Sequence, residues 1–213
     1  MLPYVRQTGL GDGWAFRHVY GYECGGAGQK IGALKYFFEV ERDSTLFEGL
    51  ETSRGRDLCE EFMGKFPVIS LTLKGATGTN FAKARTMLRR AIGNEAMRFQ
   101  FLPESDRLTK TEQSLYESMV NIDQTGACTM SDELLKDSLQ VLSRLLEKHY
   151  GKKVIMLIDE YDVPLDKAYQ SGYYDDMVEL VRILFGNALK TNESLDFAGR
   201  CWRLMALPGN MMR

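Results

Sequence analysis

The chain has 213 residues, of which 44% are hydrophobic and 26% charged, enough to bury the core of one ordinary globular domain. Its 27 Lys and Arg residues nearly balance 29 Asp and Glu residues, giving a formal net charge of −2 at pH 7. Because a broad nucleic-acid surface needs excess positive charge, we expect no nucleic-acid binding by this chain alone. No apolar run approaches the roughly 18–20 residues that span a bilayer, and the N-terminus lacks the apolar region of a signal peptide. We therefore expect no membrane partner and a cytoplasmic location.

The cysteine and histidine content excludes several kinds of site. The four cysteines are widely separated and form no CxxC pair, which favours free thiols in a reducing compartment: Cys24, Cys59, Cys128 and Cys201. The chain has two histidines, His18 and His149, which are too far apart to form the HExxH motif of zinc hydrolases.

Hydrophobic periodicity and turn residues predict alternating helices and strands. In chain order, we predict a helix within 31–47 that is interrupted at Asp43-Ser44, a helix over 54–64, a strand over 68–73, a helix over 79–101 capped by Thr79 or Asn80, a helix over 109–121, a helix from Ser131 to Gly151, a strand over 154–158, a helix that begins near Pro164 and ends at Gly172, a helix over about 174–190, and a strand that begins at 195–198.

The strand over 154–158 consists of five consecutive apolar residues without alternation. This pattern is typical of a strand that is buried on both faces, as in a parallel sheet covered by helices. Strands separated by helices predict an α/β layered fold. The tyrosines around Gly172, namely Tyr169, Tyr173 and Tyr174, are predicted to pack between the two adjoining helices.

The candidate site is the acidic segment that follows this strand, with Asp159, Glu160 and Asp162. In open α/β sheets, ligands bind at the carboxyl ends of the strands. There an aspartate can hold Mg²⁺ through oxygen ligands, and a glutamate can orient or deprotonate the water that attacks a phosphoryl group. The pattern has the form of a Walker B motif. The alternative interpretation is that these carboxylates end the strand and cap the helix near Pro164.

A longer comparison favours the functional interpretation. Four ordered strings, at 34–50, 63–75, 139–162 and 157–198, resemble the bacterial AAA-ATPase-like family, whose domain commonly precedes a PD-(D/E)XK nuclease-like domain. The resemblance covers roughly residues 33–198. It implies a P-loop NTPase-like parallel sheet flanked by helices, with ATP and Mg²⁺ as ligands. On this basis Asp159 is the metal-binding residue and Glu160 the catalytic residue.

The chain departs from the family at its phosphate loop. Family members carry Gly-Lys-Thr before the helix that corresponds to 34–38, whereas this chain has Gly26-Ala27-Gly28, with alanine where the lysine is expected. The general pattern GxxxxGK[ST] does not occur in the sequence. Gly26 and Gly28 are the candidate phosphate-binding residues, through a backbone nest, and the alternative interpretation of this glycine cluster is a flexible loop. We expect weak nucleotide binding, and whether the chain is an ATPase stays open.

Domain boundaries follow from the same comparison. We divide the chain into a divergent Gly-rich segment over 1–30, an AAA-ATPase-like core over 31–198 and a divergent tail over 199–213, with the fold expected to be incomplete at both ends. One hypothesis is a frameshifted or fragmentary gene. An alternative function is a non-catalytic interaction module that keeps the nucleotide fold and associates with itself or with a protein partner.

Overall fold

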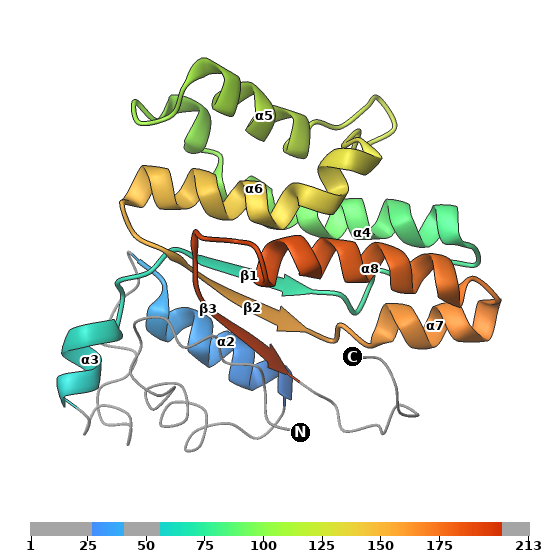
Figure 1. The fold of residues 1–213 in the computed structure, drawn as a ribbon, viewed down its shortest axis with the longest axis horizontal. Helices are drawn as coiled ribbons and strands as arrows, with labels where there is room; N and C mark the ends of the chain where they lie inside the picture. The colour runs from blue at the N-terminus through green and yellow to red at the C-terminus, as the bar shows by residue number, and fades with distance from the viewer. Residues whose placement is uncertain (1–26, 41–55, 202–213) are drawn as a thin grey trace.

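The computed structural model of the chain describes residues 27–40 and 56–201. Its centre is a parallel sheet of three strands in the order β1-β2-β3, with helices on both faces (Figure 1). The strands are β1 (Val68–Thr72), β2 (Val154–Asp159) and β3 (Leu195–Cys201). The predicted α/β class and parallel sheet are therefore confirmed, and the buried segment after 153 is the central strand.

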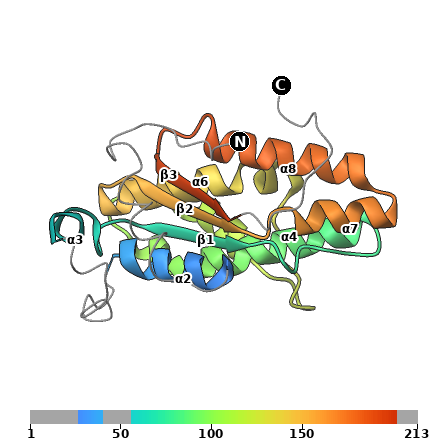
Figure 2. The ribbon, with the colours of Figure 1, turned by 90° about the horizontal axis from the view of Figure 1, so that it is seen from below.

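The helices divide between the two faces of the sheet. One face is covered by α2 and the end of α3, and the other by a thicker layer of α4, α6 and α8 with α5 outside it (Figures 1 and 2). Helix α7 follows the carboxyl end of β2 and packs beside α8. The bounds are α2 (Ala27–Phe38), α3 (Arg56–Phe62), α4 (Phe81–Ala96), α5 (Lys110–Val120), α6 (Asp132–Tyr150), α7 (Val163–Ser171) and α8 (Tyr174–Leu189).

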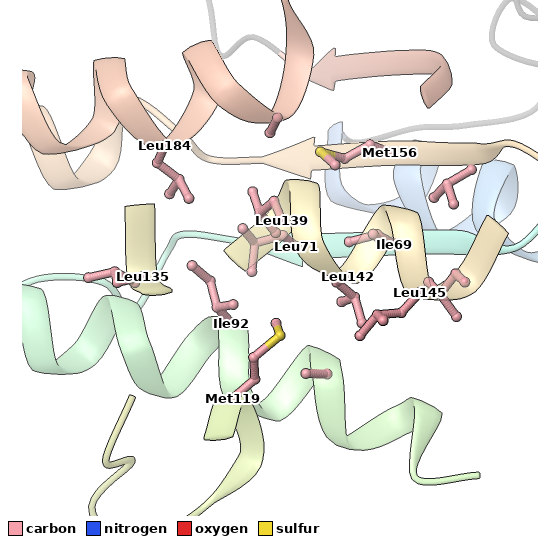
Figure 3. Packing of buried hydrophobic residues seen from close by; sticks show 14 of the residues in the cluster. Ile69, Leu71, Ile92, Met119, Leu135, Leu139, Leu142, Leu145, Met156 and Leu184 are labelled. Atoms are coloured by element: carbon pink, nitrogen blue, oxygen red, sulfur yellow. The ribbon is translucent and has the colours of Figure 1, made fainter. Parts of the chain in front are cut away.

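Strand β2 separates two hydrophobic cores. Its side chains alternate, because Ile155 and Leu157 pack under α2 whereas Val154, Met156 and Ile158 pack under the thicker helical layer. All five are fully buried, which explains the continuous apolar run. Figure 3 shows part of the larger core, where side chains from both helical and strand elements meet: Ile69, Leu71, Ile92, Met119, Leu135, Leu139, Leu142, Leu145, Met156 and Leu184.

Local residues determine where α6 begins and ends and where α4 begins. Ser131 accepts a hydrogen bond from the backbone N–H of Leu134 at 3.1 Å, and Gly151 ends α6 in the left-handed conformation with φ 69°. Asn80 caps α4 by accepting from the backbone N–H of Lys83 at 3.0 Å. These starts and the α6 stop agree with the sequence predictions.

The predicted helix over 79–101 was wrong at its end. Helix α4 stops at Ala96 and is followed by two short 3₁₀ helices, η4 (Met97–Phe99) and η5 (Leu102–Glu104). Pro103 cannot donate a backbone hydrogen bond, and in a continuous helix its ring would clash with the Phe99 carbonyl. The hydroxyl of buried Tyr116 donates to the Ala96 carbonyl at 2.8 Å, so the helix end is satisfied by a residue of α5.

The start of the first helix also differs from the prediction. Helix α2 begins at Ala27, before the predicted 31–47 segment, and the predicted second helical turn of that segment lies outside the described residues. Within residues 27–40 and 56–201, no helix has the length and apolar character needed to cross a membrane.

Candidate functional site

Strands β1 and β2 end together at one edge of the sheet. Thr72, the last residue of β1, is in register with Asp159, the last residue of β2, and the N–H of Leu73 donates to the Asp159 carbonyl at 3.0 Å. Parallel pairing therefore brings the loop after β1 beside the acidic segment after β2. This is the carboxyl edge of the sheet, where ligands bind in open α/β folds.

Glu160 turns the chain from β2 into α7. Its φ of 53° lies in the left-handed region, and it is the one residue other than glycine with a positive φ in the described part of the chain. Its carbonyl accepts a hydrogen bond from the N–H of Val163 at 3.2 Å. Such conformations cost about 1 kcal/mol or more and cluster at functional sites. The residue predicted to be catalytic thus has an unusual backbone conformation.

Burial and charge both act on the Asp159 carboxyl, which is half-buried at the strand end. Burial raises its pKa, and the neighbouring carboxylates of Glu160 and Asp162 raise it further. A hydrogen bond from the Glu160 N–H and the positive charge of Lys74 act in the opposite direction. Three carboxylates therefore lie at this edge, and the positive charge of Lys74 acts on one of them, Asp159.

These carboxylates do not serve the helix that follows. Asp162 occupies the N-cap position of α7, and Pro164 lies in the first turn as predicted, but the Asp162 side chain makes no capping hydrogen bond. Across the described residues, neither Glu160 nor Asp162 forms a salt bridge or a side-chain hydrogen bond. The capping interpretation from the sequence is therefore wrong for Asp162.

The predicted phosphate-binding glycines are only partly described. Gly26 lies outside the described residues, whereas Gly28 is the second residue of α2. At the other end of α2, the carbonyl of Phe38 accepts from the N–H of Phe66, just before β1 begins. Helix α2 therefore runs against the strand direction, and its first turn lies toward the edge at which β2 ends (Figure 1). The backbone of Gly28 thus lies toward the same edge as Asp159.

The acidic side chains alone do not form a metal cage. Within the described ranges, no group of three or more His, Cys, Asp or Glu residues is arranged to hold a metal ion. Mg²⁺ is usually bound in nucleotide sites by one or two carboxylates together with phosphate oxygens and water. The donors at this edge are carboxylate oxygens, so they fit Mg²⁺ that arrives with a polyphosphate.

Lys74 was missed by the sequence analysis. It follows the predicted strand over 68–73 directly, but only pairing between β1 and β2 brings it beside Asp159. The sequence did contain a signal for it, because a lysine directly after a second predicted strand is expected at the same carboxyl edge of a parallel sheet. The tyrosine prediction holds in part, because Tyr173 is buried between helices, whereas Tyr169 is 76% exposed.

A cavity elsewhere in the fold does not include these residues. It has a volume of about 200 Å³ and lies between α4, α6 and α8. Its charged lining includes Arg85 and Asp132, which form a salt bridge with an N–O distance of 2.6 Å. The carboxyl edge of the sheet is therefore a separate feature from this cavity.

The parallel sheet, the flanking helices and the acidic strand end are consistent with a P-loop-like α/β protein. The model of the family described as Predicted AAA-ATPase (AAA-ATPase-like) matches residues 27–199. The chain therefore belongs to this family, which is related to the P-loop NTPases. No curated protein and no solved structure matched the chain.

Proposed function

We propose that this domain binds Mg²⁺–ATP at the carboxyl edge of its sheet, with Asp159 and Glu160 as the metal-binding and catalytic residues. The observation that carries the proposal is that the carboxylates after β2 are not used by the fold at an edge where ligands bind. Family membership supports nucleotide as the ligand. In this proposal the acidic residues belong to the 31–198 core defined from the sequence, and Gly28 lies just before that core.

Each residue has a separate role in this proposal. Asp159 holds the metal, directly or through water, from the rigid end of a buried strand. Bound Mg²⁺ would neutralise charge that develops on the transferred phosphoryl group. Glu160 orients the attacking water and accepts its proton. The backbone N–H groups at the start of α2, including that of Gly28, face the phosphates, as free N–H groups at helix N-termini do for anions.

A second candidate function is a nucleotide-binding or interaction module without turnover. It is favoured by the sequence Gly26-Ala27-Gly28, which lacks the lysine and the hydroxyl that neutralise phosphate and hold Mg²⁺ in an intact phosphate loop. The two candidates share the binding step and differ in hydrolysis. In the second, ligand binding changes association with another copy or with a protein partner.

Calorimetric titration with Mg²⁺–ATP tests the shared step. We expect saturable binding by the wild type and at least a roughly tenfold weaker Kd for Asp159→Asn, because a charged metal ligand is lost. Asp175→Asn, an exposed aspartate on α8, is the matched control and should bind like the wild type. A well-folded wild type that does not bind Mg²⁺–ATP would overturn the proposal.

Phosphate release then separates the two candidates. Hydrolysis by the wild type that falls by about 100-fold or more in Glu160→Gln supports the catalytic role. The control is Glu133→Gln, an exposed glutamate in the first turn of α6. Binding without release, together with a change in size-exclusion elution on adding Mg²⁺–ATP, identifies the non-catalytic module.

A further inference from the structure

Lys74 lies near the start of the loop that joins β1 to α4. It is exposed, and its ammonium forms no ion pair or hydrogen bond with any described residue. Its neighbour Leu73 is bound to the carbonyl of Asp159 at 3.0 Å, so the lysine projects from the same edge as the acidic segment. A cation that is uncommitted in the fold remains available to an anionic ligand.

The loop around Lys74 is ordered by its own contacts. The side chain of Ala76 is fully buried, and its N–H donates to the Leu73 carbonyl at 3.0 Å, while the N–H of Thr77 donates to the Gly75 carbonyl at 2.9 Å. A Cβ atom built on Gly75 would meet no atom within 4 Å. The loop is therefore anchored by Ala76 and open at Gly75, next to the lysine.

Tyr173 anchors the far end of the same loop. Its hydroxyl donates to the Gly78 carbonyl at 2.8 Å, across 95 residues of sequence, and its ring contacts Phe81 with a centroid separation of 6.5 Å. Gly78 lies so close to α4 that a Cβ atom there would come within 2.5 Å of the Ala84 nitrogen. Tyr173 is also the N-cap residue of α8, which packs on α7, the helix that follows the acidic segment. One side chain therefore ties the far end of the β1–α4 loop to the junction between α7 and α8.

Charge balance at the edge indicates what Lys74 does. The three carboxylates of Asp159, Glu160 and Asp162 repel a polyphosphate, and the Gly26-Ala27-Gly28 segment carries no charge. Lys74 follows Leu73, whose N–H is bonded to Asp159, and its positive charge acts against the raised pKa of the Asp159 carboxyl, so it supplies positive charge at this edge. Lysine is a common phosphate ligand in proteins.

We propose that Lys74 binds the phosphate groups of the nucleotide at this edge, and that Tyr173 positions Lys74 by holding the β1–α4 loop through Gly78. This inference rests on the proposed function, because it assigns the cation of the same site. In this arrangement the β1–α4 loop binds the phosphate groups through Lys74. The acidic segment at the end of β2 binds the metal ion through Asp159.

Titration of Lys74 variants with Mg²⁺–ATP tests the first part. We expect Lys74→Gln to weaken the Kd by about tenfold, Lys74→Arg to stay within about threefold of wild type, and the salt dependence of binding to decrease in Lys74→Gln. Lys110→Gln, an exposed lysine at the start of α5, is the matched control. Wild-type binding with an unchanged Kd in Lys74→Gln would overturn this inference alone. Absence of wild-type binding would overturn the proposed function together with it.

A double-mutant cycle tests the positioning role of Tyr173. Tyr173→Phe removes only the hydroxyl, and we expect the Kd for Mg²⁺–ATP to rise by about threefold to fivefold in the wild-type background. In the Lys74→Gln background the same change should have almost no effect on the Kd, although it lowers the thermal stability equally in both. Equal losses of affinity in the two backgrounds would show that Tyr173 does not act through Lys74.

Discussion

Two groups of carboxylates lie at opposite ends of the sheet, and their surroundings differ. Near the start of β1, the buried side chains of Glu39 and Glu95 both accept hydrogen bonds from the guanidinium of Arg98. At the carboxyl edge, Glu160 and Asp162 have no such partners among the described residues. Burial of charge is unfavourable for both groups. Only Glu39 and Glu95 are paired with a cationic side chain that offsets this cost.

The compensated group also closes the edge of the sheet. The carboxylate of Glu95 accepts from the N–H of Ser70 in β1 at 2.7 Å, which occupies a donor that an edge strand would otherwise expose. Burial raises the pKa of Glu95, while Arg98 and the Ser70 N–H favour its charged form. Because every member has a partner, this cluster stabilises the fold. An acidic cluster without partners contributes little to folding and leaves its oxygen atoms available to a ligand.

Removing the central cation should break the compensated group. We expect Arg98→Ala to lower the free energy of unfolding by about 3–5 kcal/mol, because two buried carboxylates lose the guanidinium to which both are hydrogen-bonded. Urea unfolding followed by circular dichroism measures the change. The control is Arg90→Ala, an exposed arginine on α4, which should change stability by less than about 0.5 kcal/mol. A loss below about 1 kcal/mol for Arg98→Ala would contradict the structural role.

A solvent-facing ion pair provides an intermediate case. Glu112 accepts from the Thr109 N–H at 2.8 Å in a capping box and from Lys148 at 2.8 Å, and these contacts lower its pKa to about 2. Since the folded state favours the charged form, this stabilisation is complete above the ordinary value of 4.5 and is lost as the pH falls toward 2. We expect Glu112→Gln to cost about 1 kcal/mol at neutral pH, after allowance for solvent screening, and almost nothing near pH 2.

Urea unfolding of both proteins at the two pH values measures this difference, with Glu117→Gln on the exposed side of the same helix as the control. A cost that does not change with pH would show that the Glu112 charge has no role in stability.

At the carboxyl edge, a substitution of Glu160 is expected to stabilise the protein, whereas the substitutions above destabilise it. Glu160→Gly should raise the free energy of unfolding by about 0.5 kcal/mol, because glycine adopts a φ of 53° without steric cost and a repelling charge is removed. Glu160→Ala removes the charge but keeps the conformational cost, so the difference between the two variants isolates the backbone. Equal stability of the two variants would show that position 160 is not strained.

The smallest effect is expected at Asp162. Because its side chain makes no capping bond, Asp162→Ala should change stability by less than about 0.5 kcal/mol, whereas replacing a true N-cap residue by alanine costs about 1 kcal/mol. Thermal unfolding measures this, with Asn80→Ala at the cap of α4 as the positive comparison. A large loss at Asp162 would restore the capping interpretation.

Much of the fold could be predicted from local signals. The cap at Ser131, the stop at Gly151 and the apolar strand before Asp159 depend on neighbouring residues, so the sequence predicts them. The end of α4 depends on Pro103 and on a hydrogen bond from Tyr116, which lies in the next helix. The periodic apolar pattern continues past this point, which is why the predicted helix was too long.

In the candidate site too, one part could be predicted from local sequence and the other part depends on tertiary contacts. The acidic strand end at Asp159 and Glu160 is contiguous in sequence, and its position after a buried strand follows from the hydrophobic pattern. The nearness of Lys74 depends on which strands pair and in what register, and the bond from Tyr173 to Gly78 joins residues 95 positions apart. Sequence alone therefore determined the elements and the chemical character of the acidic segment, because both arise from short-range interactions. Only the tertiary structure decided which charges share an edge and which are compensated, because strand pairing and packing bring distant residues together.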